Sequence, residues 1–167
     1  MPLLPLFSDA YDICAFRARP EALYSKATVA CIGGPVYHAA VPTSQIVIDT
    51  NVLVAAQRSK RGASAKLISL VGTDRFDIHV SVPLVLEYEE VLLRHRAELN
   101  LTQEDVADLI DAFCALSTHQ NIYFLWRPYL RDIKDELVLE LAVAAQCDYI
   151  ITYNQKDFGG ADSSEFG

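Results

Sequence analysis

The stretch SQIVIDTNVLVAA, residues 44–56, sets three polar residues between two apolar runs. Residues 46–48 are typical of a buried strand, which the polar residues Asp49, Thr50 and Asn51 interrupt. A carboxylate that leaves water at such a point must be compensated, and a metal ion is one candidate for that compensation. The stretch therefore predicts a buried strand whose carboxyl end carries a candidate cation site.

The sequence after this stretch alternates between strand and helix patterns. Residues 76–82 alternate apolar and polar side chains, which predicts a strand, and Pro83 suits the first turn of the helix that follows. Strands that alternate with helices indicate an α/β domain with a mainly parallel sheet. The predicted elements are strands over 46–48, 76–82, 121–126 and 148–154, and helices over 64–72 (capped by Ser64), 83–99, 102–119 and 135–146.

The two ends of the chain differ from this central region. Residues 1–44 hold five of the seven prolines and show no sustained period, which predicts a poorly ordered or loosely packed extension. Residues 159–167 are rich in glycine and serine and do not form a strand pattern. We therefore expect one domain over residues 45–158, flanked by the extension and a short tail.

Composition narrows the class of protein. The 167 residues are 51% apolar and carry a formal net charge of −8, which argues against a protein that coats nucleic acid but not against a nuclease whose carboxylates hold a cation. The four cysteines form no CxxC pair, which favours reduced thiols. With no apolar run of membrane length and no secretory pattern at the amino terminus, we expect a cytoplasmic protein.

Several carboxylates and one amide are predicted to lie at strand-to-helix junctions, where parallel sheets bind ligands. Carboxylates that converge in one crevice repel each other unless a cation neutralises them. Hard oxygen ligands suit Mg²⁺ or Mn²⁺, and this arrangement fits metal-dependent cleavage of phosphodiesters. The positions at these junctions are Asp49, Glu87, Asp132, Asp135, Asn154 and Asp157.

Each of these positions also has a structural interpretation. Asp135 can be the N-cap of a helix, and Asp132 can belong to a surface loop. Glu87 can lie on a solvated helix face with two neighbouring glutamates, and Asn51 can be a turn residue. Spacing alone does not choose between these interpretations and a shared site.

Three motifs in this order resemble those of the PIN domain family: VIDTNVLVAA, SVPLVLEYEEVLLR and DELVLELAVAAQCDYIITYNQKDF. They are closest to the branch that supplies the toxins of bacterial toxin–antitoxin pairs, and the resemblance covers residues 45–158. It implies a three-layer α/β/α sandwich and a ribonuclease that uses Mg²⁺ or Mn²⁺ to cleave single-stranded RNA. It also implies a cognate antitoxin as partner and, commonly, a homodimer.

The resemblance assigns roles to individual residues. It makes Asp49, Glu87 and Asp135 the catalytic residues that bind the metal, with Asp132 as a nearby accessory. The supporting residues also include Thr50 and Asn51, which orient Asp49 or a water molecule. The fourth acid of the family commonly falls where this chain has Asn154, so either Asp157 substitutes for it or the site works with three acids.

The basic residues Arg58, Lys60, Arg61 and Lys156 are candidates for guiding the RNA backbone, although clustered charges usually form a solvated face. A second interpretation is a catalytically weakened PIN-like module that binds an antitoxin or an RNA-processing assembly. A third is a phosphoaspartate enzyme with Asp49 as nucleophile, which requires a second aspartate where Asn51 stands.

Overall fold

The apolar run at residues 46–48 forms the centre of the sheet. Ile46, Val47 and Ile48 have no exposed surface, because helices cover both faces of their strand. The computed structural model describes residues 14–17, 43–123, 133–154 and 158. The strands in these residues are β1 (Cys14–Arg17), β2 (Ser44–Ile48), β3 (Phe76–Val80), β4 (Thr118–His119) and β5 (Tyr149–Thr152).

These strands form a five-stranded sheet with the order β1-β5-β2-β3-β4. Strand β2 pairs in parallel with β3 on one side and β5 on the other, and β4 continues the parallel arrangement beyond β3. Strand β1 pairs antiparallel with β5, at one edge of the sheet. The carboxyl ends of four strands therefore lie at the same edge, as the sequence predicted for a mainly parallel sheet.

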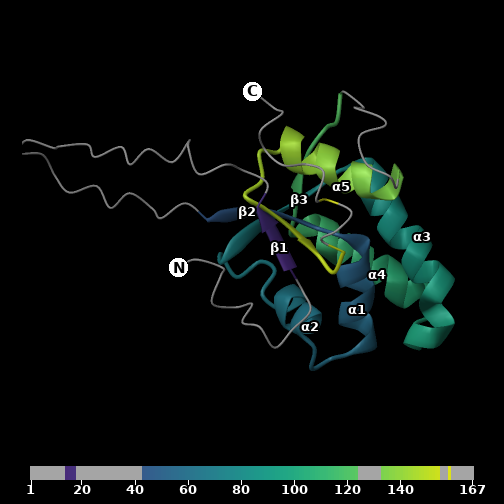
Figure 1. Ribbon diagram of the computed structural model, residues 1–167. Coiled ribbons are helices and arrows are strands. Elements are labelled where there is room, and N and C mark those ends of the chain that lie inside the picture. The colour runs from purple at the N-terminus through teal and green to yellow at the C-terminus, as the bar shows by residue number, and fades with distance from the viewer. Residues whose placement is uncertain (1–13, 18–42, 124–132, 155–157, 159–167) are drawn as a thin grey trace, which may run out of the picture.

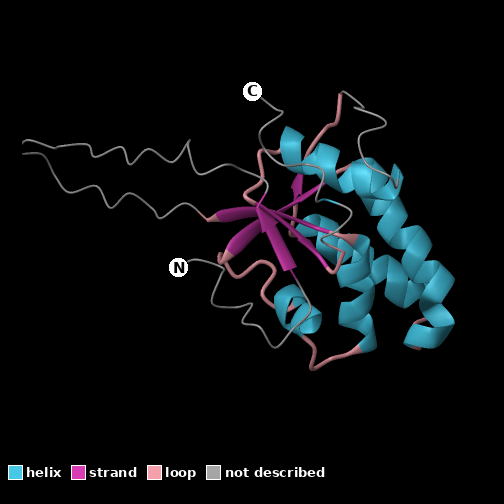
Figure 2. Ribbon diagram, viewed as in Figure 1, coloured by secondary structure: helices cyan, strands magenta, loops and turns pink. Residues whose placement is uncertain are grey.

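Helices pack on both faces of the sheet (Figures 1 and 2). Helix α5 contacts β2, β3 and β5, and Figure 1 shows α1 and α2 on the other side of the strands. Helix α3 contacts α1, α4 and α5. This arrangement is the expected three-layer α/β/α sandwich. The helices are α1 (Thr50–Arg58), α2 (Ala63–Ile68), α3 (Val82–Leu99), α4 (Gln103–Ala115) and α5 (Ile133–Ala144).

Helix α3 joins the sheet to α4 through its apolar side. Leu84, Tyr88 and Leu92 recur at a spacing of four residues and are fully buried. The Tyr88 ring meets the ring of Phe113 from α4 edge-on, with centroids 5.7 Å apart and planes at 87°. Pro83 lies in the first turn of α3, where its missing N–H is no loss.

The prediction for the helix after Gly62 was wrong at both ends. Helix α2 begins at Ala63 and ends at Ile68, and its N-cap is Gly62 rather than Ser64. The hydroxyl of Ser64 hydrogen-bonds the hydroxyl of Tyr153 at 2.7 Å instead of capping the helix. Turns then continue to Gly72, whose positive φ of +75° suits glycine.

The predicted boundary between the fourth helix and the following strand was also wrong. Helix α4 ends at Ala115, and the hydroxyl of Ser117 donates to the carbonyl of Phe113, which competes with further helix. The chain therefore reaches the sheet early, as the two-residue strand β4. Residues 121–123 form a loop in which Tyr123 is 81% exposed, and residues 124–126 lie outside the described residues.

Strand β1 comes from the segment that we expected to be an extension, and no sequence pattern predicted it. Four residues pair with β5, from Cys14 opposite Thr152 to Arg17 opposite Tyr149. The division of the chain into extension, domain and tail remains a prediction. No helix in the described ranges combines the length and apolar character needed to span a membrane.

Candidate active site

Asp49 is the single residue between the end of β2 at Ile48 and the start of α1 at Thr50. It is the N-cap of α1, with φ −71° and ψ 148°, and its Oδ1 accepts from the backbone N–H of Asn51 at 3.3 Å. This explains the polar interruption of the apolar run, because an N-cap needs a side-chain acceptor rather than an apolar residue. Asn51 is therefore a helix residue, so its interpretation as a turn residue was wrong.

The other oxygen of Asp49 is held by two further donors. Oδ2 accepts from the Thr152 hydroxyl at 2.5 Å and from the side-chain amide of Asn51 at 2.6 Å. The Thr152 hydroxyl in turn accepts from the backbone N–H of Asn154 at 2.9 Å. Strand β5 and the loop after it thus fix the carboxylate that ends β2.

Burial nevertheless dominates the ionisation of Asp49. Only 6% of the residue is exposed, and desolvation raises its pKa above the ordinary 3.8, although the bonds from Thr152 and Asn51 act in the opposite direction. The protein therefore keeps an acid where its charged form is unfavourable. A nearby cation would relieve that penalty.

Glu87 approaches the same place from α3. The next residue, Tyr88, is fully buried and donates its hydroxyl to the Ile48 carbonyl, immediately before Asp49. Desolvation raises the pKa of Tyr88 far above 10.0, and the charges of Asp49 and then Glu87 raise it further. Both carboxylates therefore act on one buried hydroxyl.

Glu87 and Glu90 lie on the same helix but differ in exposure, which bears on whether Glu87 belongs to a solvated face. Glu90 is exposed and pairs with Arg94 four residues on. Glu87 is half-buried, and its Oε2 is shielded from solvent. Glu87 is thus partly shielded from solvent while Glu90 faces water.

Asp135 lies in the first turn of α5, which begins at Ile133, so the interpretation of Asp135 as an N-cap was wrong. A negative charge in a first turn still interacts favourably with the helix dipole. Among the described residues, no three His, Cys, Asp or Glu side chains are grouped so that they could hold a metal ion. Asp132 and Asp157 lie outside those residues.

Of Thr50 and the four predicted basic residues, one is buried, three are exposed and one lies outside the described residues. Thr50 is buried, and its Oγ1 has no hydrogen-bond partner among the described groups, so this hydroxyl does not orient Asp49. Arg58 ends α1, roughly 13 Å along the helix from Asp49, and forms an exposed ion pair with Glu98 at 3.3 Å. Lys60 and Arg61 follow it and are exposed. Lys156 lies outside the described residues.

Two buried polar residues were not predicted from the sequence as candidates, Thr152 beside Asp49 and Glu136 on α5. Thr152 contacts Asp49 directly, but a threonine at the end of an apolar strand has the pattern of an ordinary strand residue. Glu136 is 1% exposed on α5, and its position beside Asp135 made the pair look like one acidic helix start. The only available signal for Thr152 was its place before Asn154 at a strand end.

A family model described as PIN domain matches residues 45–156, and the chain belongs to the PIN domain family. PIN domains are typically metal-dependent nucleases, which makes nucleic acid the expected class of substrate. A search among curated proteins gives no match to this chain.

Proposed function

We propose that this protein is an endoribonuclease that cleaves single-stranded RNA with Mg²⁺ or Mn²⁺. The observation that supports this most strongly is the buried carboxylate of Asp49 at the carboxyl end of β2, held by Asn51 and Thr152. Glu87 precedes the fully buried Tyr88, whose hydroxyl donates to the carbonyl of Ile48 next to Asp49, which supports a shared site for the two acids. Ligands of parallel sheets bind at this edge.

The candidate ligands for a divalent cation have suitable chemistry, although the described residues hold no group of three acidic side chains close enough to share one ion. Asp49, Glu87 and Asp135 would supply hard oxygen ligands, and the buried Thr50 Oγ1 offers a further oxygen that no described protein group uses. When bound, the cation supplies charge neutralisation and lowers the pKa of a water molecule for phosphodiester hydrolysis.

The protein's own groups orient the acid. Asn51 and Thr152 hold Oδ2 at 2.6 and 2.5 Å, whereas among the described residues Oδ1 accepts a weaker bond of 3.3 Å from the Asn51 N–H. The backbone of Thr50 also stabilises the charged carboxylate. Oδ1 is therefore the oxygen left for a ligand. Fixing Oδ2 sets the direction of Oδ1 before substrate binds, which reduces the reorganisation needed during the reaction.

The finer identity of the protein, a toxin with a cognate antitoxin, rests on its resemblance to that branch of the family. Products with a 5′-phosphate and a 3′-hydroxyl are expected by the same analogy. The neighbouring reading frame tests the toxin role: it should encode a small protein that inhibits the nuclease when the two are mixed. Full activity in the presence of that protein would contradict the toxin role and leave the nuclease proposal standing.

The test of the nuclease proposal compares matched glutamates on one helix. With Mn²⁺ and a labelled single-stranded RNA, we expect Asp49→Asn and Glu87→Gln to lose most activity. Glu90→Gln, which removes a surface charge from the same helix, should cleave like the wild type. Equal rates for Glu87→Gln and Glu90→Gln would exclude a role for Glu87, and equal rates for Asp49→Asn and wild type would overturn the proposal.

A PIN-like binding module is the second candidate. The absence of a metal-binding group of three side chains among the described residues favours it, as does an amide, Asn154, in place of a fourth acid. Calorimetric titration separates the two functions. A module would bind RNA or an antitoxin without binding Mn²⁺, whereas a nuclease binds the ion.

A further inference from the structure

A cavity of about 210 Å³ opens at the carboxyl end of β3, between the first turns of α3 and the residues that follow α4. Val82, Val85 and Leu86 of α3 form its apolar wall. Val82 is 70% exposed and Leu86 is 59% exposed, which is unusual for apolar side chains on a helix that packs against a sheet. The cavity is open to the surface and has a largely apolar lining.

Four polar side chains line the same cavity: Ser81, His119, Gln120 and Asn121. Nε2 of His119 already donates to the carbonyl of Cys114 at 2.9 Å. Ser81 is 4% exposed, yet its hydroxyl does not cap α3 and takes part in no hydrogen bond of the described residues. The Gln120 backbone N–H donates to the Val80 carbonyl at 2.8 Å, which fixes this segment against β3. Within the described part of the chain, the side-chain amides of Gln120 and Asn121 form no hydrogen bond and remain available to a ligand.

The cavity adjoins the candidate active site. Val80 ends β3 as Ile48 ends β2, and these strands are parallel neighbours, so their ends lie at one edge of the sheet. Leu86 directly precedes Glu87. Cys114 lines the cavity, and the residue before it, Phe113, packs edge-on against the ring of the buried Tyr88.

We propose that this cavity binds one unpaired nucleobase of the RNA and so sets a base preference next to the cleavage site; this rests on the proposed function. The volume is below the roughly 300–1,000 Å³ of pockets for drug-sized ligands, which suits one small ring. None of its described lining residues is Lys or Arg, and Nε2 of the lining His119 is already bonded to the Cys114 carbonyl, which together disfavour a phosphate. Single-stranded RNA is read through splayed-out bases that meet apolar surfaces and hydrogen-bonding side chains.

Apolar and polar lining residues would contact different parts of the base. The apolar wall of Val82, Val85 and Leu86 covers the face of the ring. The Ser81 hydroxyl and the amides of Gln120 and Asn121 each offer both a donor and an acceptor to the ring edge. Because a buried polar group left without a partner is costly, bases whose edges match these groups bind best.

Cleavage assays test the pocket through a blocked variant and a matched control. Val82→Trp places a bulky ring at the mouth of the cavity, and Leu116→Trp places the same ring at a site that is 56% exposed and outside the lining. With oligonucleotides that differ in one base near the cut, Val82→Trp should lose about tenfold in kcat/KM and most of the wild-type base preference. Leu116→Trp should keep both. Identical base preference in all three proteins would overturn the proposal.

A binding experiment without metal separates this proposal from the nuclease itself. Amide shifts of the full chain are followed by NMR while adenosine, guanosine, cytidine, uridine or ribose 5-phosphate is added. We expect at least one nucleoside to shift Ser81, Gln120 and Asn121, and Gln120→Leu to weaken that binding several-fold. No shift with any nucleoside, or the same shifts with ribose 5-phosphate, would contradict a base pocket even if the protein cleaves RNA. Nucleoside binding by a protein that cleaves no RNA would retain the pocket and reject the nuclease.

Discussion

The two ends of β2 carry polar groups in opposite circumstances. At the carboxyl end, burial raises the pKa of Asp49, so the charged form that a cation site needs is unfavourable. At the amino end, the Gln45 side chain donates to Asp77 at 2.8 Å and accepts from His79 at 2.6 Å. There hydrogen bonds from Thr43 and Gln45 lower the pKa of Asp77, so its charged form is favoured.

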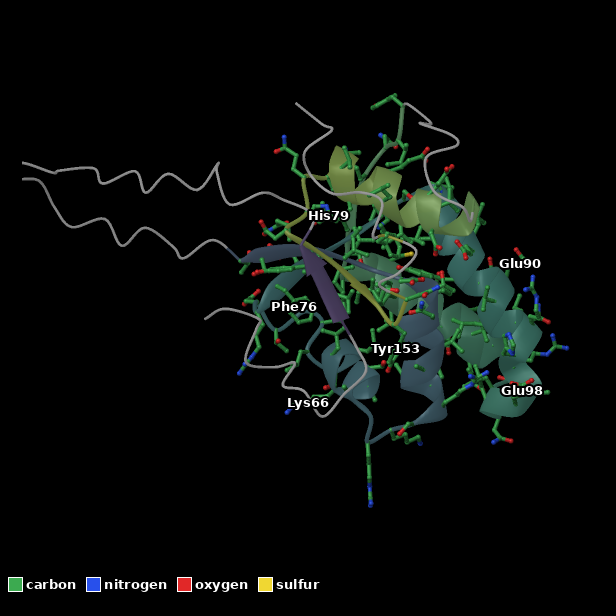
Figure 3. All side chains as sticks on the ribbon, in the orientation of Figure 1. Lys66, Phe76, His79, Glu90, Glu98 and Tyr153 are labelled. Carbon is green, nitrogen blue, oxygen red and sulfur yellow. The ribbon has the colours of Figure 1, made fainter. Side chains whose placement is uncertain are left out.

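The amino end of β2 is also tied to the neighbouring strand β5 through hydrogen bonds of its backbone. Gln45 exchanges two hydrogen bonds with Asp148, at 2.8 and 2.7 Å, which ties β2 to the start of β5. Figure 3 shows His79 on the side of the sheet that α5 covers and Phe76 on the side of α2, as alternation along β3 requires. The amino end therefore contributes stability, whereas the carboxyl end keeps a costly group for function.

The largest expected effect is at Asp49. Asp49→Asn keeps an N-cap residue and an acceptor for Thr152 but removes the charge. We expect cleavage to fall roughly 100- to 1,000-fold, while the free energy of unfolding without metal rises by about 1 kcal/mol because the desolvation penalty is gone. RNA cleavage and urea denaturation measure the two effects. An Asp49→Asn variant that is both inactive and less stable than the wild type would contradict the claim that Asp49 is kept for function at a cost in stability.

The corresponding change at the other end is Gln45→Met, which keeps the volume and removes the amide. Asp77 and His79 each lose a partner, so we expect a loss of about 2 kcal/mol in the free energy of unfolding. Activity per folded molecule should be unchanged, since the site is at the opposite end of the strand. A large loss of activity with unchanged stability would show that the two ends are not independent.

Thr152 tests how the acid is held. Thr152→Val preserves shape and removes the hydroxyl that bonds Asp49 at 2.5 Å. We expect about a tenfold loss in kcat, equivalent to about 1.4 kcal/mol, because Oδ2 is less well fixed. Thr152→Ser restores the hydroxyl and should recover most activity; a serine variant as slow as the valine variant would point to packing instead.

The smallest effect concerns the pH dependence of His79, which hydrogen-bonds the side chain of Gln45. Burial lowers the pKa of His79 below 6.5, so the folded protein binds fewer protons than the unfolded chain in that window. The stability from neutral His79 is present above pH 6.5 and is lost as pH falls through the folded pKa. In thermal melts from pH 7.5 to 5, His79→Gln should remove a fall of about 2–4 °C in Tm. Equal slopes for the two proteins would contradict this assignment.

The sequence predicted the parts of the fold that follow from local pattern. The apolar run before Asp49 became a strand, and so did residues 76–80 of the alternation predicted over 76–82, whereas Ser81 is the N-cap residue of α3 and Val82 begins it. Strand β1 forms by pairing with β5, and the two-residue β4 forms by pairing with β3. No local sequence pattern predicts these pairings. Long-range partners are what a single sequence shows least.

The same limit applies to the candidate site. Asp49 was identifiable because a polar residue after a buried strand breaks a pattern, and Glu87 because a family motif contains it. Thr152 follows the strand pattern, so only its contact with Asp49 reveals its role. Ser64 looked like a helix cap but bonds Tyr153 instead, which Figure 3 shows beside α1 at the end of β5.

The most direct test is Mn²⁺ binding measured by calorimetry on wild type, Asp49→Asn, Glu87→Gln and the surface control Glu90→Gln. We expect the wild type and Glu90→Gln to bind the ion alike, and an excess of about 100 times Kd to raise their free energy of unfolding by about 2.7 kcal/mol. Asp49→Asn and Glu87→Gln should bind at least tenfold more weakly. Equal affinity in all four proteins, or none in the wild type, would contradict a cation shared by Asp49 and Glu87.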